Sequence, residues 1–343
     1  MQNSLADIEN PKLLHHGGGL WAAAAQYGIP LSDWLDLSTG INANGWKAPL
    51  MPENIWQRLP ESDDDLTPIA QAYYNTEQVL PVAGSQAAIQ VLPMLCKNSR
   101  VGVIHPGYAE HAHAWGRCGH QVKPINSAEI DQTISELDIL ILINPNNPTG
   151  TVFDPQQLLD WHHQLALRDG WLIVDEAFID CTPERSLATY SQRSGLVILR
   201  SLGKFFGLAG ARVGFVCAQA ELLSSLNALL GPWTISSASR WLASTALKDQ
   251  VWQQTTRLRL LEDSQRMQSL LSNYDLVPNG GCALFQWSQT SQAAMLHEHL
   301  AKLGILTRLF SQPSSLRFGI PGNQADWQRL ETTLARVTEK ASF

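Results

Sequence analysis

The sequence predicts an α/β fold in which helices cover both faces of a mostly parallel sheet. Between about Thr67 and Leu230, short apolar runs without polar alternation are separated by helix-like stretches. Such runs are typical of strands that are buried on both faces. Residues with chemically useful side chains follow these runs directly, which is where open α/β sheets bind ligands. After about Leu230 the pattern changes, and we expect a smaller α+β part.

Local signals predict the elements in chain order. Residues 20–27 resemble a short helix broken at Gly28-Ile29-Pro30, and a short strand from Trp34 runs into a loop rich in Gly and Asn. A helix is expected from Gly84-Ser85-Gln86 to about Cys96, with a bend at Pro93, and another over 155–168 with Pro155 in its first turn. The expected strands of the larger part are residues 79–82, 101–104, 137–143, 171–174 and 196–199. The smaller part is expected to hold helices at 236–247, 251–272 and 291–303 and a strand at 283–287.

Composition limits the class of protein. A chain of 343 residues with 44% apolar and 16% charged residues can build two domains with a large core. Its net charge of −7 argues against nucleic-acid binding as the main role. The five cysteines are odd in number and lack C-x-x-C spacing, so we expect reduced thiols of a cytoplasmic protein and no metal site. Residues 1–9 lack a signal-peptide pattern, and no stretch reaches the roughly 18 apolar residues of a membrane span.

Lys204 is the first candidate for chemistry. It lies in a glycine-punctuated loop directly after the apolar run that ends near Leu199. A lysine in apolar surroundings has a lowered pKa, and its neutral amine can attack a carbonyl to form a Schiff base. Arg212, eight residues later, adds a fixed cation that would suit a phosphorylated aldehyde. From this stretch alone, a solvated surface lysine is an equally good interpretation.

The lysine segment resembles that of fold-type I pyridoxal-phosphate (PLP) enzymes, the aspartate-aminotransferase-like group that includes histidinol-phosphate aminotransferases. Three further motifs match this group in the right order, and the resemblance covers essentially the whole chain: Gly84-Ser85-Gln86, residues 144–150 (NPNNPTG) and Asp175-Glu176-Ala177-Phe178. The resemblance implies PLP as the cofactor and a homodimer. It also implies an N-terminal arm (1–45) that packs with the small domain, a large PLP-binding domain (46–230) and a small C-terminal domain (231–343).

The cofactor phosphate would need several donors. Gly84 permits a close backbone turn, and the N–H groups of Ser85 and Gln86 would point toward the anion. By resemblance, Ser201 adds a hydroxyl and Arg212 a charged pair. The Gly-Ser-Gln motif alone is more simply a helix cap.

The cofactor ring would contact three other residues. Asp175 ends an apolar strand, where an unpaired carboxylate is costly, and the resemblance places it against the pyridine nitrogen of PLP. Asn147 is expected to donate to the ring 3′-oxygen, and Tyr108 to stack on the ring. Their alternatives are a helix cap, an Asx turn and an ordinary core tyrosine.

Two positions depart from the commoner pattern of the group. Phe178 stands where many members have a tyrosine that also reaches the 3′-oxygen, and Gly203 replaces a serine or threonine before the lysine. Phenylalanine cannot donate a hydrogen bond. One cofactor contact is therefore in doubt.

The resemblance also implies substrate contacts. Arg317 matches an arginine that binds the substrate carboxylate, for which a planar guanidinium is suited. Asn42 would add a second carboxylate contact. We place the substrate phosphate near His16 and the backbone of Gly17. A surface salt bridge for Arg317 and a structural cap for His16 are the alternatives.

Several segments favour one reaction within the group. Residues 16–18, 36–42, 108–111, 175–180, 200–208 and 231–233 together look like threonine-phosphate decarboxylases of the cobalamin pathway. These enzymes convert L-threonine O-3-phosphate, a phosphorylated amino acid, to (R)-1-aminopropan-2-yl phosphate and CO2. Histidinol-phosphate aminotransferase is the alternative, although Leu59 stands where that enzyme usually has a tyrosine. A non-catalytic scaffold is a third reading, against which the retention of Lys204, Asp175 and Arg212 counts.

Overall fold

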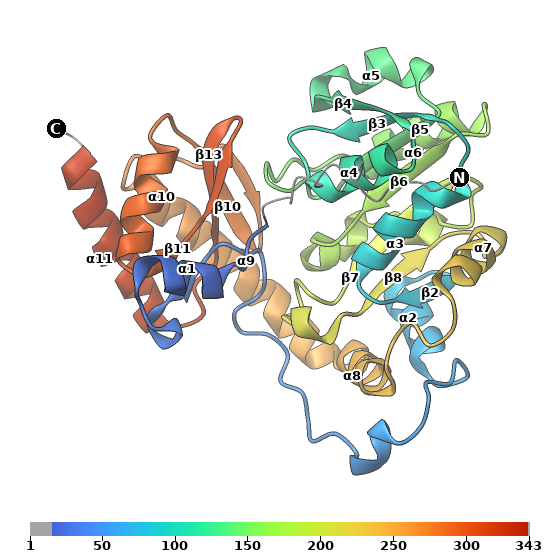
Figure 1. Cartoon of the computed structure of the whole chain (residues 1–343), viewed down its shortest axis with the longest axis horizontal. Coiled ribbons are helices and arrows are strands. Elements are labelled where there is room, and N and C mark those ends of the chain that lie inside the picture. The colour runs from blue at the N-terminus through green and yellow to red at the C-terminus, as the bar shows by residue number, and fades with distance from the viewer. Residues whose placement is uncertain (1–15, 342–343) are drawn as a thin grey trace, which may run out of the picture.

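The computed structural model describes residues 16–341, so the N-terminal stretch without a signal-peptide pattern lies outside the described residues. Figure 1 shows a larger and a smaller body, bridged by the long helix α9 (Gln250–Ser272). The larger body holds a seven-stranded sheet in the order β2-β8-β7-β6-β5-β3-β4. Strand β8 runs antiparallel to the other six strands, which all point the same way. The predicted α/β class with a mostly parallel sheet is therefore confirmed.

The five expected strands of this sheet are all present. They are β2 (Val79–Val82), β3 (Arg100–Ile104), β5 (Ile139–Ile143), β6 (Trp171–Asp175) and β7 (Leu196–Ser201). Two further strands, β4 (Gln121–Ile125) and β8 (Gly214–Cys217), were not predicted from the sequence. Strand β4 lies at the sheet edge and most of its residues face solvent, so it lacks the apolar run of a buried strand.

The apolar side chains of the central strands pack into two hydrophobic cores, one on each face of the sheet. Along β6, Leu172 and Val174 pack into one core cluster and Ile173 into the other. Strand β7 alternates in the same way, because successive side chains of a strand point to opposite faces. Helices cover the sheet: α2 (Leu66–Tyr74), α3 (Ser85–Val91), α4 (Ala109–Arg117), α5 (Ile130–Thr133), α6 (Pro155–Ala166) and α7 (Ala220–Leu230). The expected bend at Pro93 is a change from α3 to a 3-10 turn over Leu92–Leu95.

The smaller body is built on an antiparallel sheet in the order β12-β13-β10-β9. Its strands are β9 (Gly280–Cys282), β10 (Phe285–Gln289), β12 (Arg308–Ser311) and β13 (Ser314–Gly319), and its helices include α10 (Ala293–Lys302) and α11 (Gln324–Ala341). The N-terminal segment joins this body, because β1 (Leu35–Asp36) pairs with β11 (Ile305–Leu306) and α1 (Leu20–Tyr27) packs near α10. Helix α8 (Ser237–Lys248) instead packs on α2, where Arg240 holds Asp64 through two hydrogen bonds of 2.6 Å. The domain boundary at residues 230 and 231 stays a prediction.

The loop after β5 touches the smaller body closely. Gly150 has a φ of +70°, and a Cβ there would lie 2.2 Å from the backbone nitrogen of Gly281 in β9. Only glycine therefore fits this contact. Because the same loop carries Asn147, the contact fixes the position of that residue relative to both bodies.

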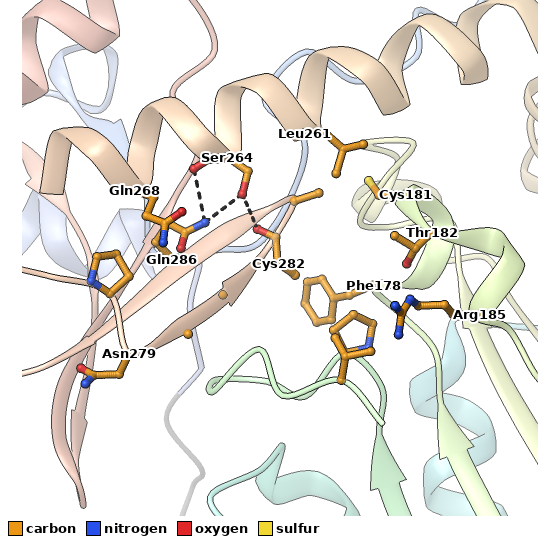
Figure 2. A pocket seen from close by; sticks show the side chains of 16 residues that line it. Phe178, Cys181, Thr182, Arg185, Leu261, Ser264, Gln268, Asn279, Cys282 and Gln286 are labelled. Atoms are coloured by element: carbon orange, nitrogen blue, oxygen red, sulfur yellow. Dashed lines mark hydrogen bonds between the residues drawn. The ribbon is translucent and has the colours of Figure 1, made fainter. Parts of the chain in front are cut away.

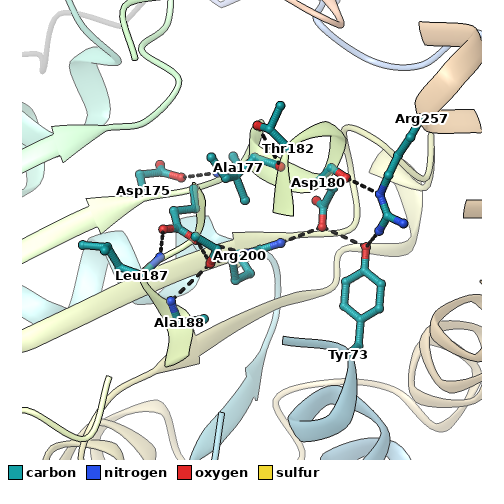
Figure 3. Close-up of polar contacts among 12 residues, drawn as sticks. Tyr73, Asp175, Ala177, Asp180, Thr182, Leu187, Ala188, Arg200 and Arg257 are labelled. Carbon is teal, nitrogen blue, oxygen red and sulfur yellow. Dashed lines mark hydrogen bonds and ion pairs between the residues drawn. The ribbon is translucent and has the colours of Figure 1, made fainter. Parts of the chain in front are cut away.

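A buried polar network supports the ends of β6 and β7 (Figure 3). The guanidinium of Arg200 donates to Glu176 at 2.9 Å and to Asp180 at 2.6 Å, and all three side chains are buried. Asp180 also accepts from Tyr73 at 3.0 Å, and its backbone carbonyl accepts from Arg257 of α9 at 2.8 Å. Glu176 and Arg200 are the direct neighbours of Asp175 and Ser201, so the network fixes the two strand ends on which those residues lie.

Replacing Arg200 by methionine should strongly destabilise the protein. The substitution keeps much of the apolar bulk but leaves two carboxylates buried without their cation, which typically costs about 3–5 kcal/mol. Urea unfolding measures the loss. Arg100→Met is the matched control, because Arg100 pairs with Asp138 at the surface and both side chains are more than a third exposed. Equal stability losses in the two variants would contradict this role of Arg200.

Candidate active site

A cavity of about 150 Å³ opens where β5, β6 and β7 end. Every residue that the sequence analysis assigned to the cofactor lines it: Gly84, Ser85, Gln86, Tyr108, Asn147, Asp175, Ser201, Lys204 and Arg212. They come from loops that are far apart in the sequence. The parallel strands bring them together, because such strands end at the same edge of the sheet.

Lys204 presents an amine with a lowered pKa to this cavity. Although the residue is only partly buried by surface area, its surroundings desolvate the ammonium group. This desolvation, with the positive charges of Arg317 and Arg212, lowers the pKa to about 8, against the opposing charge of Asp175. Among residues 16–341, the Nζ of Lys204 has no hydrogen-bond or ion-pair partner, and it lies 5.5 Å from the centre of the Phe178 ring. The amine is therefore available to a ligand.

Phe178 forms a wall between the cofactor cavity and a second, wider one. The wider cavity, about 600 Å³, lies between the two bodies and is lined by residues of α9, β9 and the segment after Phe178 (Figure 2). Edge-to-face packing on Phe285, with ring centres 5.2 Å apart, holds Phe178 in place. Phe178 therefore offers no hydroxyl to a ligand, and its apolar ring separates the two cavities.

Two cysteines of the wider cavity are protonated thiols. Burial raises the pKa of Cys181 well above its ordinary value and that of Cys282 to about 12.

Within residues 16–341 all five cysteines are free, and no group of three or more His, Cys, Asp or Glu side chains could hold a metal ion. No helix in the described part of the chain is both long and apolar enough to cross a membrane.

Asp175 has one oxygen in a turn and the other on a histidine. Its Oδ1 accepts from the backbone N–H of Ala177 at 3.1 Å, which is the cap-like contact of the alternative interpretation. Its Oδ2 lies 3.0 Å from Nε2 of His111, and both residues are almost fully buried. His111 was not predicted from the sequence as a partner. The available signal was its position three residues after Tyr108, the N-cap of α4, because this spacing brings two side chains to the same side.

The other end of the cavity is built for an anion. Gly84 has a φ of +71°, and a Cβ there would lie 2.6 Å from Nη2 of Arg212. Nη1 of Arg212 donates to the carbonyl of Ala209 at 3.0 Å, and the described residues provide no carboxylate partner. Helix α3 begins at Ser85, so its first N–H groups lack acceptors within the helix. A guanidinium, two serine hydroxyls and backbone N–H groups fit a phosphate.

This donor set fits the PLP that the resemblance implies. The cavity offers an amine for the aldehyde, a cation for the phosphate, a carboxylate for the pyridine nitrogen and an aromatic ring. A PLP phosphate, aldehyde and ring nitrogen each need a different one of these groups. The roles of the individual residues stay predictions.

Arg317 lies beside the cavity and is not a surface residue. It is 6% exposed, and burial with the charge of Arg308 lowers its pKa to about 10. Its Nη1 donates to Oδ1 of Asn147 at 2.5 Å, and its Nη2 donates to the backbone carbonyl of Ser38 at 2.8 Å. The alternative interpretation as a surface salt bridge is therefore wrong.

Asn42 is placed differently from the cofactor residues. Its Nδ2 donates to the carbonyl of Phe205 at 2.9 Å, and its Oδ1 accepts from Arg259 at 3.0 Å and from the N–H of Asn44 at 3.0 Å. The residue is buried and does not line the cofactor cavity. Its predicted contact with a substrate carboxylate would require it to give up one of these bonds, and it stays a prediction.

His16 and Gly17 line a further cavity of about 640 Å³ between the N-terminal segment and the smaller body. The ring of His16 also lies 5.9 Å from that of Tyr108, so the segment reaches the cofactor cavity. Arg308 lines the same space. It is the register partner of Arg317 across β12 and β13, and the sequence analysis missed it. The short turn between the two strands was the available signal, since it places both arginines on one face.

Comparison with known proteins is consistent with this geometry. The profile of the aminotransferase class I and II family matches residues 56–334. A threonine-phosphate decarboxylase from Pseudomonas aeruginosa is 54% identical over 96% of this chain and 99% of its own. The crystal structure of L-threonine-O-3-phosphate decarboxylase from Porphyromonas gingivalis has a TM-score of 0.76 at 20% identity, covering 88% of this chain and 99% of that one. Histidinol-phosphate aminotransferase from Sinorhizobium meliloti, solved in complex with pyridoxal-5′-phosphate, has a TM-score of 0.79 at 17% identity over 98% of both chains.

These structural likenesses establish the fold alone, since one fold hosts both activities. The family profile covers most of the chain, and the high identity extends over nearly its full length. Together with the cavity at the strand ends, they show that the chain belongs to the aminotransferase class I and II family.

Proposed function

We propose that the chain is a PLP-dependent decarboxylase that converts L-threonine O-3-phosphate to (R)-1-aminopropan-2-yl phosphate and CO2 in cobalamin biosynthesis. The observation that carries this choice is the 54% identity, over nearly the whole chain, to a threonine-phosphate decarboxylase. The cavity that gathers every predicted cofactor residue supports the chemistry.

Different residues of the cavity would bind different groups of the cofactor. Lys204 would bind the aldehyde, Arg212 with Gly84, Ser85, Gln86 and Ser201 the phosphate, Tyr108 the ring face, Asn147 the 3′-oxygen and Asp175 the ring nitrogen. When bound, PLP supplies a sink for the electron pair that the bond between Cα and the carboxylate releases. His111 is within hydrogen-bond distance of the oxygen of Asp175 that is not used in the turn, and would fix the orientation of this carboxylate.

The substrate's two anionic groups would meet the two paired arginines of β12 and β13. Arg317 would bind the carboxylate, because its guanidinium already contacts Asn147 of the cofactor cavity. Arg308, with His16 and Gly17, would bind the phosphate in the adjoining space that these three residues line. Asn42 would assist at the carboxylate. This arrangement sets the direction of the bond that breaks.

A proton must be returned to Cα after CO2 leaves, and we assign this role to the Nζ of Lys204. A pKa of about 8 lies close to neutrality, where one group can both hold and deliver a proton. Phe178 lines the cavity beside this amine without competing for the proton, because its ring carries no hydroxyl.

Transamination, as in histidinol-phosphate aminotransferase, is the second candidate. The likenesses to solved structures do not distinguish the two reactions, because each shows the fold alone. The high sequence identity favours decarboxylation.

A cytoplasmic homodimer is the expected form of the enzyme. Large apolar side chains are exposed in a stretch before α2 and in the loop after α7: Leu50 (98%), Trp56 (70%), Leu59 (63%) and Trp233 (60%). Exposed apolar groups of this size are typical of association surfaces. A second copy of the chain is the partner that we propose for them.

Asp175→Asn and Arg212→Ala should separate two roles. The first variant should retain PLP but lose most of its turnover, because a neutral amide no longer holds the proton on the ring nitrogen. The second should release PLP more readily, because the phosphate loses its charged donor. Equilibrium dialysis and steady-state turnover measure the two effects. Full activity of Asp175→Asn, or unchanged PLP affinity of Arg212→Ala, would count against these assignments.

Purified enzyme should release CO2 from L-threonine O-3-phosphate without any 2-oxoglutarate. Decarboxylation leaves the cofactor in its starting form, whereas transamination stops after one turnover until a keto acid arrives. Trapping of CO2 and chromatography of the amine product test this directly. If turnover requires 2-oxoglutarate and histidinol phosphate is the better substrate, the enzyme is the aminotransferase instead.

A further inference from the structure

The carboxylate of Glu110 joins the N-terminal segment to the cofactor cavity. Glu110 lies in the first turn of α4, and its side chain is only 13% exposed. Its Oε1 is 2.8 Å from Nε2 of His16. Its Oε2 accepts from the side-chain amides of Gln86 at 2.8 Å and Gln90 at 3.0 Å, both on α3. One carboxylate therefore serves three donors from two separate segments.

Glu110 also acts on Tyr108, through Gln86. Because Nε2 of Gln86 donates to Glu110, its Oε1 is left to accept from the hydroxyl of Tyr108, at 3.1 Å. Burial and the negative charge of Glu110 raise the pKa of Tyr108, so the hydroxyl keeps the proton that it donates. The orientation of the Tyr108 ring at the cavity thus depends on Glu110.

The N-terminal segment at His16–Gly18 contacts both Glu110 and residues next to the smaller body. The N–H of Gly18 donates to Oγ of Ser38 at 2.8 Å, and the carbonyl of Ser38 accepts from Arg317 at 2.8 Å. His16, two residues before Gly18, contacts the larger body through Glu110. The segment is therefore bonded to Glu110 of α4 directly and to Arg317 of β13 through Ser38.

We propose that Glu110 is a positioning residue, which sets His16 and the segment after it at the substrate side of the cavity and holds Tyr108 at the cofactor side. A neutral amide could bind Gln86 and Gln90 without placing negative charge near an anion site. A carboxylate adds a charge-assisted bond to the imidazole of His16, which is roughly twice as strong as a neutral one. The effect on substrate rests on the proposed decarboxylase function; the effect on the segment does not.

Hydrogen exchange of the PLP-loaded enzyme without substrate tests the positioning itself. In Glu110→Gln, the backbone amide of Gly18, which donates to Ser38, should exchange roughly 10-fold faster, the effect expected from losing one hydrogen bond to a charged group. Glu136→Gln is the matched control, because Glu136 is an exposed carboxylate on another part of the larger body, 3.4 Å from Nζ of Lys123. Unchanged exchange in Glu110→Gln, with a native circular dichroism spectrum, would overturn the proposal.

A double-mutant cycle tests the action through His16. With L-threonine O-3-phosphate, Glu110→Gln should raise KM on the order of 10-fold and change kcat much less. The double variant Glu110→Gln with His16→Ala should be no worse than His16→Ala alone, because both remove the same contact. Additive losses would show that Glu110 does not act through His16. If the wild-type enzyme fails to decarboxylate this substrate, the proposed function fails, and the exchange experiment still decides the role of Glu110.

Discussion

The site depends on keeping one lysine amine largely out of water. Desolvation and two neighbouring guanidinium groups lower the pKa of Lys204 to about 8. An ammonium group that is exposed to solvent would remain charged, and it could not act as a nucleophile near neutral pH. The cations Arg212 and Arg317 disfavour the charged form of Lys204. The ring of Phe178 adds no hydroxyl that could exchange a proton with this amine.

The fold meets this requirement by placing the lysine at the junction of two bodies. The larger body supplies the strand ends, and the buried network around Arg200 holds them rigid. The smaller body supplies Arg317, whose contacts with Asn147 and Ser38 join β13 to the cofactor loop and to the N-terminal segment. Glu110 of α4 adds a further link, because its carboxylate contacts His16 of the N-terminal segment. Arg317 and Asp175, which both act on Lys204, are thus held by residues outside their own loops.

The sequence was informative where chemistry lies at the end of a buried strand. Asp175 and Ser201 end β6 and β7, and Asn147 follows β5, so an apolar run marks each of them. Residues that depend on tertiary pairing could not be found in the same way. Arg308 becomes a neighbour of Arg317 only through strand pairing, and His111 and Glu110 gain their partners only when α4 packs on the sheet and on α3. Strand β4 was missed because it is a polar edge strand.

The most direct test of this account is the rate at which cofactor-free protein takes up PLP, measured against pH by visible absorbance. The account predicts that the second-order rate constant rises up to about pH 8 and then levels off, because the neutral form of Lys204 is the reactive one. Lys204→Ala should show no such uptake. A rate that keeps rising through pH 8 and levels off only above about pH 10, as expected for an exposed lysine with a pKa of about 10.4, would contradict the central claim.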